Sequence, residues 1–177
     1  MFMRFLLSFF MLISALTYGQ SERTILYAQA TEFGYRNQFQ EAEKILSQII
    51  ALHPNDSMAY FDRAIMREHL GDTLGAIADL TREIEIDEKS ADNYFVRGIL
   101  YQKTKKYSLA LDDFRKVNHL DFGNADAHYF AAQMYSILQK NTFFVKRQLK
   151  QCLKVNPAHH DALIPLKNTR RILFRMN

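Results

Sequence analysis

Three adjacent residues near the C-terminal end, His159, His160 and Asp161, are the cluster whose types and spacing could support metal binding or general-base chemistry. They lie just after Pro157, separated from it by Ala158, and we expect solvated turn residues there. The other histidines show no HExxH or Cys/His spacing, and no Gly-rich phosphate-binding loop is present. The single cysteine, Cys152, excludes an intramolecular disulfide and a multi-cysteine zinc site. We therefore predict that the protein is not an enzyme and has no cofactor or metal; an enzyme with an unrecognised site is a third-ranked alternative.

The elements that position these residues follow from an internal repeat. The stretch that begins at Ser57 recurs from Ala91 onward, with many of the same residues at the same spacing. The identities are Tyr60/Tyr94, Phe61/Phe95, Arg63/Arg97, Ile65/Ile99, Ala76/Ala110, Asp79/Asp113 and Asp87/Asp121. A fixed period between about 20 and 50 residues indicates a stack of repeated supersecondary units.

At this period, residues 20–177 form one domain with units 23–56, 57–90, 91–124 and 125–159 and a cap at 160–177. Each unit has the apolar spacing of two amphipathic helices. Tight corners are predicted at Asn37–Gln38, Gly71–Asp72 and Lys105–Lys106. Small residues recur where two helices must approach closely, at Ala30, Ala64, Gly98 and Ala132 and at Ala42, Ala76 and Ala110. In the cap, we expect the continuous helix to begin near Pro165.

This pattern resembles the tetratricopeptide repeat family over residues 23–159. The matching positions are Ala30, Phe39, Ala42, Leu46 and Pro54; Tyr60, Ala64, Gly71, Ala76 and Leu80; Gly98, Tyr101, Tyr107, Ala110 and Phe114; and Ala132, Tyr135, Leu149, Cys152 and Pro157. The last unit matches only with one extra residue in the corner around Lys140 to Phe143. The resemblance implies an all-α, right-handed solenoid of about four helix-turn-helix units with a C-terminal capping helix.

The resemblance also implies that the first helices of successive units line a concave groove. Its predicted ladder is entirely aromatic, which suits binding of a peptide or helical segment of a partner protein. The candidate groove residues are Tyr27, Phe61, Phe95 and Tyr129, flanked by Thr31, Ile65, Ile99 and Gln133 and by His69 and Lys103 toward the helix ends. The alternative is that these rings pack within and between repeats.

One subclass of the family grips C-terminal carboxylates with lysines, an arginine and asparagines. The matching places here hold Tyr27, Thr31, Asp62, Asp92 and Val96, so that clamp is absent. A receptor for acidic chaperone tails is therefore not expected.

Two arginines stand where such repeats are usually apolar, and each precedes an aspartate by the same offset: Arg63 with Asp79 and Arg97 with Asp113. This offset places the acid on the second helix of the same unit. We predict arginine–aspartate pairs across each helical hairpin. The alternative is an arginine pair that binds phosphate or carboxylate.

Charge is distributed unevenly along the chain. Residues 20–139 hold 13 basic and 18 acidic side chains, whereas residues 140–177 hold 9 basic residues and one acid, Asp161. The candidate basic end is Lys146, Arg147, Lys150, Lys154, Arg170, Arg171 and Arg175. This asymmetry suggests an anionic membrane or an acidic protein as an alternative partner. The oligomeric state does not follow from the sequence.

Residues 1–19 have one positive charge, an apolar run from Phe5 to Leu16 and a small residue, Gly19, at the end. This is the build of a secretory signal peptide, with an uncleaved membrane anchor as the alternative. We therefore expect an exported interaction or assembly module, periplasmic or extracellular, and no nucleic-acid partner.

Overall fold

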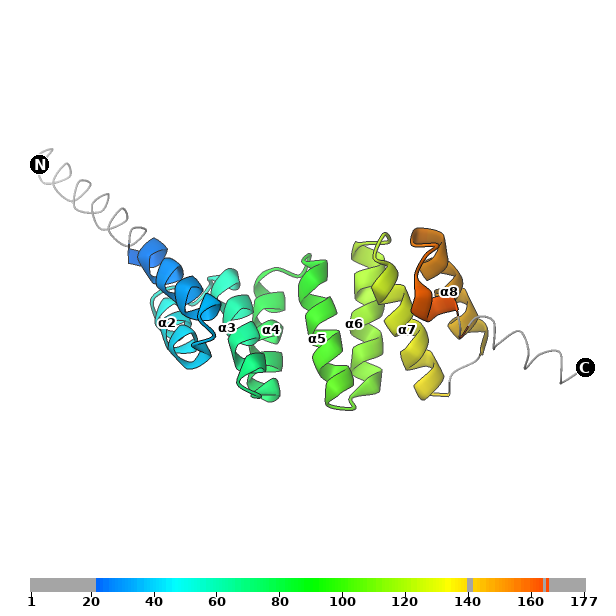
Figure 1. The fold of residues 1–177 in the computed structure, drawn as a ribbon, viewed down its shortest axis with the longest axis horizontal. Helices are drawn as coiled ribbons and strands as arrows, with labels where there is room; N and C mark the ends of the chain where they lie inside the picture. The colour runs from blue at the N-terminus through cyan, green and yellow to red at the C-terminus, as the bar shows by residue number, and fades with distance from the viewer. Residues whose placement is uncertain (1–21, 140–141, 164, 166–177) are drawn as a thin grey trace, which may run out of the picture. The chain divides into compact units, whose positions relative to one another are not determined.

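The computed structural model describes residues 22–139, 142–163 and 165 (Figure 1). Over these residues the chain forms helices joined by short turns and contains no strand, which confirms the all-α prediction. None of the described helices is both long enough and apolar enough to cross a membrane. The predicted signal peptide and most of the predicted cap, including Arg170, Arg171 and Arg175, lie outside the described residues.

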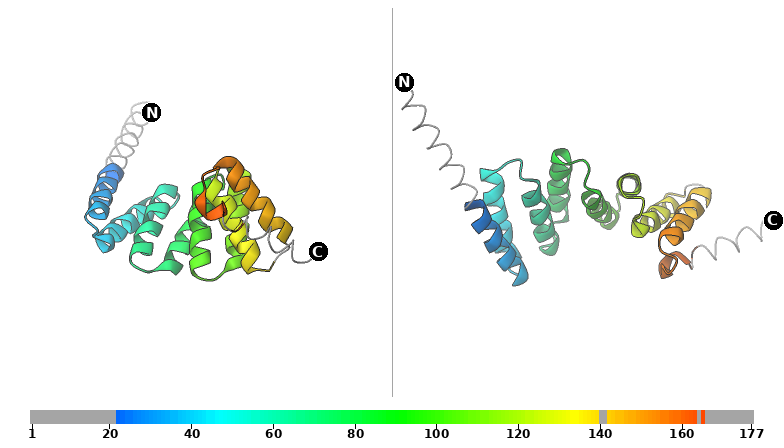
Figure 2. Two further views of the ribbon diagram at one scale, coloured as in Figure 1. Left: turned by 45° about the vertical axis from the view of Figure 1, so that its right-hand side comes forward. Right: turned by 90° about the horizontal axis from the view of Figure 1, so that it is seen from above.

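The chain divides into two structural units, which meet between Asp79 and Leu80. The first contains a helix at residues 22–35, α2 (Phe39–Leu52) and α3 (Ser57–His69), and it ends within α4 (Thr73–Ile86). The second contains the rest of α4, α5 (Ala91–Lys103), α6 (Tyr107–Leu120), α7 (Ala125–Ile137) and α8 (Thr142–Val155). Within the second unit α6 packs against α5 and α7, and α7 packs against α8, as the green to orange segments of Figure 2 show.

Helix starts repeat with the period of the sequence. Helices α2, α4 and α6 begin at Phe39, Thr73 and Tyr107, and α3, α5 and α7 begin at Ser57, Ala91 and Ala125. Both series therefore have the spacing that separates Tyr60 from Tyr94. Helix α8 spans Thr142–Val155. The corner predicted to hold one extra residue includes residues 140 and 141, which lie outside the described residues.

The cap departs from its prediction at one point. Residues 160–163 are already helical, so the last helix begins before Pro165 rather than at it. The helix start is therefore set by the turn at residues 156–159, where the backbone N–H of His159 donates to the carbonyl oxygen of Asn156.

Among the described residues, each corner between the two helices of a pair contains one residue in the left-handed region. These residues are Asn37, Gly71, Lys105 and Gln139, with φ of 58°, 82°, 60° and 51°. A left-handed residue directs the chain back along the preceding helix and ends that helix. The predicted corners at Asn37, Gly71 and Lys105 are confirmed.

The core of each unit forms where small residues allow helices to approach. All seven predicted small positions are buried. At Gly98, an added Cβ would lie 2.9 Å from Cε1 of Phe114, a side chain that is fully buried. The ring of Phe114 therefore occupies the space that a larger residue at 98 would need.

Candidate functional site

The first unit contains a hollow of about 340 Å³ that is enclosed by the helix at residues 22–35, by α2 and by α3. Its size is near the lower end for ligand sites in proteins, which are about 300–1,000 Å³. The lining residues are Ala30, Thr31, Gly34, Tyr35, Asn37, Phe39, Leu46, Asp62, Met66 and His69.

The floor of the hollow is apolar. Ala30 and Leu46 are buried, and the thioether of Met66 lies beside Gly34, where an added Cβ would be 3.8 Å from Sδ. One wall is a stacked pair, Phe39 and His69, with ring centroids 4.3 Å apart and an interplanar angle of 5°. An apolar floor with a flat ring wall suits the aliphatic part of a side chain better than a fully polar ligand.

A single acidic side chain, Asp62 of α3, lines this hollow. Asp62 is half-buried. This burial is the main cause that raises the pKa of the Asp62 carboxyl above its ordinary value, and the negative charge of Asp56 raises it further. Within the part of the chain that the structure describes, the Asp62 carboxylate makes no hydrogen bond or ion pair. The carboxylate is therefore partly desolvated without a compensating positive group.

The neighbouring arginines on α3 are engaged elsewhere. Arg67 pairs with Glu43 at 2.9 Å and with Asp79 at 2.9 Å. Arg63 donates from Nε and Nη2 to the two carboxylate oxygens of Asp79, at 2.9 and 2.7 Å, and from Nη1 to Ser47 Oγ at 3.1 Å. Neither guanidinium is directed at Asp62.

The second unit repeats this arrangement at the equivalent positions. Arg97 donates from Nε and Nη2 to the carboxylate of Asp113, at 2.9 and 2.8 Å, and from Nη1 to Thr81 Oγ1 at 3.2 Å. Asp79 and Asp113 are both buried. The predicted arginine–aspartate pairs are thus present as structural braces, and the phosphate-binding alternative is contradicted because the aspartates occupy both guanidinium groups.

The four predicted aromatic rungs are each half-buried. In the second unit, the ring of Phe95 packs edge-on against Phe114 and Phe130, with centroids 5.9 and 5.8 Å apart. The ring of Tyr129 packs against Phe130 and His159, and its hydroxyl accepts a hydrogen bond from Gln133 at 2.7 Å. These two rungs contribute much of their surface to packing within the unit.

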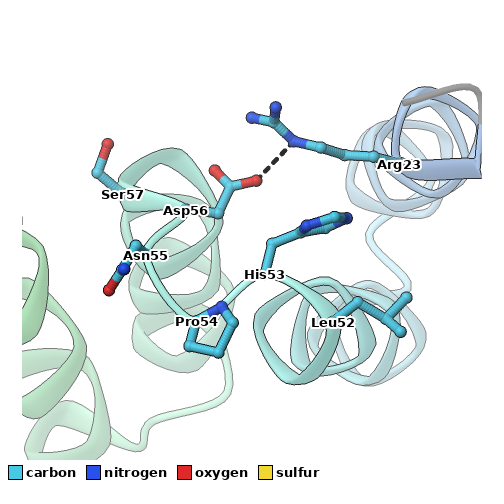
Figure 3. Close-up of a pocket in the computed structure, with 7 residues that line it drawn as sticks. All are labelled: Arg23, Leu52, His53, Pro54, Asn55, Asp56 and Ser57. Carbon is cyan, nitrogen blue, oxygen red and sulfur yellow. Dashed lines mark ion pairs between the residues drawn. The ribbon is translucent and has the colours of Figure 1, made fainter. Parts of the chain in front are cut away.

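In the first unit, a second hollow, of about 450 Å³, lies near the turn between α2 and α3 and is lined in part by Arg23 and Asp56 (Figure 3). Tyr27 is anchored by Asp56. Its hydroxyl donates to Asp56 Oδ1 at 2.7 Å, and Arg23 Nε lies 2.7 Å from Asp56 Oδ2. Burial and the hydrogen bond to Asp56 raise the pKa of the Tyr27 phenol. Because Asp56 is already paired, and also caps α3 through the Ala59 N–H, this hollow is a structural joint.

The residues predicted to flank the ladder lie in different surroundings. Thr31 and His69 are exposed and line the 340 Å³ hollow. Ile65 and Ile99 are half-buried, and Lys103 is exposed. Gln133 is half-buried and bonded to Tyr129.

The expectation for His159 was wrong. Its side chain is 10% exposed, its Nε2 lies 3.0 Å from Asp126 Oδ1, and its ring packs on Tyr129 with centroids 5.0 Å apart. His160 and Asp161 are solvent-exposed, as expected, but they begin the last helix rather than lie in a turn. Over the described residues, no group of three or more His, Cys, Asp or Glu side chains could hold a metal ion.

The described part of the basic end lies on α8. A hollow of about 260 Å³ is lined by Phe143, Lys146, Arg147, Lys150 and Gln151. These residues lie three or four apart and so share one face of the helix. Lys154, one turn further on, is exposed. Helix α8 contains no acidic residue.

Comparison with known proteins shows which proteins share this fold. Residues 35–97 match the tetratricopeptide repeat family model. MamA from Desulfovibrio magneticus RS-1 is 18% identical with a TM-score of 0.75, and the alignment covers 84% of this chain and 85% of that one. YrrB, described as a TPR protein with an unusual peptide-binding site, is 21% identical with a TM-score of 0.72, covering 84% and 76%.

Two further similarities are more partial. The first TPR of Spaghetti (RPAP3), solved with the HSP90 peptide SRMEEVD, is 19% identical with a TM-score of 0.60, covering 66% of this chain and 92% of that one. Serine/threonine-protein phosphatase 5 of Rattus norvegicus is 26% identical over 118 residues, which are 67% of this chain. The chain spans about a quarter (24%) of the length of that curated relative.

The protein is a helical-repeat protein. Its paired helices recur with the same spacing as the internal sequence repeat. The fold is that of tetratricopeptide repeat proteins, and residues 35–97 match the model of that family.

Sequence reasoning missed two features of the site. The hollow depends on Met66 and the Phe39–His69 stack, which come from helices distant in sequence and have no common spacing. In the sequence, Asp62 stands out only as a residue that does not fit the carboxylate clamp. The sequence does contain one further signal for Asp62. Sixteen residues after Arg63 stands an opposite charge, Asp79, whereas sixteen residues after Asp62 stands Ala78, which cannot neutralise it.

Proposed function

We propose that the protein is a non-catalytic interaction scaffold that holds an extended or helical segment of a partner protein in the 340 Å³ hollow of its first unit. The observation that carries the proposal is the hollow itself, which combines an apolar floor, a ring wall and a polar rim. Peptide binding by YrrB and by the first TPR of RPAP3 supports the same use of this fold. The half-buried Phe61 and Ile65, on the same helix as Asp62, would extend the contact surface.

A filled-hollow variant tests this function. Peptides enriched from a random display library on the full-length protein would be titrated by calorimetry against wild type, Thr31→Trp and Gln29→Trp. Thr31 is exposed and lines the hollow, whereas Gln29 is exposed on the same helix outside it. The proposal predicts at least a tenfold loss of affinity, about 1.4 kcal/mol, for Thr31→Trp and none for Gln29→Trp. Equal binding by both variants would overturn it.

A second candidate function rests on α8. Lys146, Arg147 and Lys150 share one face with the exposed Phe143, a combination that suits an anionic membrane surface. Each basic residue near such a surface contributes on the order of 1 kcal/mol. Sedimentation with phosphatidylserine vesicles should fall at high salt and in a Lys146→Gln/Arg147→Gln/Lys150→Gln variant. Equal sedimentation with neutral phosphatidylcholine vesicles would contradict it.

We also propose that the protein acts in the cell envelope or outside the cell, on the strength of residues 1–19. The mass of the protein recovered from its native host tests this location. A chain that begins near Gln20 supports export with cleavage, and a chain that keeps the segment from Met1 to Gly19 in a soluble fraction contradicts it.

A further inference from the structure

We infer that the partner segment presents a lysine or arginine, flanked by apolar residues, whose positive group pairs with Asp62. This inference rests on the proposed function of the same hollow and adds the chemistry of its ligand. It makes Asp62 the residue that determines specificity.

The charge of the hollow is unbalanced in favour of a cation. Asp62 is half-buried, and no described residue pairs with it, although two arginines lie close by on the same helix. Arg63 is held by Asp79 and Ser47, and Arg67 by Glu43 and Asp79. Other buried aspartates in the same unit, Asp56 and Asp79, are both compensated by arginines. Asp62 therefore differs from Asp56 and Asp79 because it has no positive partner within the described residues. A ligand could supply that partner.

The shape of the hollow fits the rest of a long basic side chain. The methylene groups of lysine or arginine would lie along Ala30, Leu46 and Met66 while the charged head reaches the carboxylate. A guanidinium would also find a flat surface in the stacked rings of Phe39 and His69.

The same charge disfavours acidic ligands. A carboxylate entering the hollow would meet Asp62 in a partly desolvated site, where like charges repel strongly. We therefore expect this chain to reject SRMEEVD, the acidic peptide held by the first TPR of RPAP3.

The test uses four peptide pools with one central position fixed as Lys, Arg, Gln or Glu and the flanking positions drawn from Leu, Val, Ser and Gly. Fluorescence anisotropy would compare their binding to the full-length wild type, Asp62→Asn, Asp62→Lys and a control, Glu41→Gln. Glu41 is exposed on α2 outside the hollow, and its substitution changes the net charge by the same amount as Asp62→Asn. Thermal unfolding confirms that each variant folds.

Wild type and Glu41→Gln should bind the Lys and Arg pools about tenfold more tightly than the Gln pool, as expected for a charge-assisted hydrogen bond. Asp62→Asn should remove this preference, and Asp62→Lys should reverse it toward the Glu pool. A wild type without charge preference, or a preference that survives both Asp62 substitutions, would overturn the inference. If Thr31→Trp still abolishes binding in that case, the peptide-binding function stands and only its specificity is wrong.

Discussion

Arg97 on α5 and Asp113 on α6 are joined by two parallel hydrogen bonds, from Nε to Oδ2 at 2.9 Å and from Nη2 to Oδ1 at 2.8 Å. Arg63 and Asp79 are joined in the same way in the first unit. Each pair braces the two helices of a hairpin, and the third arginine nitrogen reaches a hydroxyl on the preceding helix. These pairs fix the two helices of each hairpin against each other. Their effect on binding is therefore indirect, because they position the helices that contain the predicted groove residues.

Removing one member of a brace should destabilise the protein strongly. Asp113→Ala leaves the half-buried guanidinium of Arg97, whose side chain is 14% exposed, without its partner, which we expect to cost about 3 kcal/mol in the free energy of unfolding. Urea denaturation measures it. The control is Arg115→Ala, whose ion pair with Asp112 is exposed at 3.7 Å and should contribute less than about 1 kcal/mol. Similar midpoints for the two variants would contradict the brace.

Gly98 and Phe114 should behave as a coupled pair. Gly98→Ala places a Cβ 2.9 Å from the Phe114 ring and should destabilise, although alanine is the better helix former by about 1 kcal/mol. The equivalent positions one repeat earlier hold Ala64 and Leu80, so Gly98→Ala/Phe114→Leu restores a combination that this sequence already uses. The double variant should be more stable than the sum of the single changes predicts, by about 0.5–3 kcal/mol. Strict additivity in urea denaturation would show that the contact is not limiting.

Glu83 should make stability depend on pH. It is buried and accepts a hydrogen bond from Asn93, and burial raises its pKa above the ordinary value. Its neutral form is therefore favoured by folding, so its stabilising contribution is complete below the unfolded pKa of about 4.3 and is lost as the pH rises through the folded value. Relative to wild type, Glu83→Gln should gain stability between about pH 4 and pH 7. A stability difference that is constant over this range would contradict the assignment.

Cys152 should be unreactive in the folded protein. Burial, then the negative charge of Asp126, raise the pKa of its thiol to about 11. At about pH 8 the folded thiol is neutral, whereas an unfolded cysteine has a pKa of about 8.5 and is partly thiolate. Ellman's reagent should modify the native protein slowly and the guanidinium-unfolded protein at once, with one thiol per chain. Rapid modification of native protein would place Cys152 at the surface.

The helices, corners and braces could be predicted because they depend on a repeated local pattern. The repeat period determines where small residues and turns recur, and the constant offset between arginine and aspartate places Arg97 opposite Asp113. Ring exposure could not be predicted in this way, because the same spacing serves packing and groove positions. Phe95 lies against Phe114 and Phe130, and Tyr27 is anchored by Asp56.

His159 shows most clearly which contacts a repeat pattern cannot predict. Its position after Pro157 predicts a solvated turn, but the carboxylate of Asp126 and the ring of Tyr129 bury it. Such a contact depends on the tertiary packing of α7 against the last turn, for which a single unit of the repeat contains no signal.

Hydrogen–deuterium exchange on the full-length protein, with and without a Lys-centred peptide from the pools above, tests the central claim most directly. We expect ligand-dependent protection in residues 30–39 and in α3 around Asp62 and Met66, and loss of that protection in Thr31→Trp. Protection confined to α8, or none in the first unit while the peptide remains bound, would contradict it.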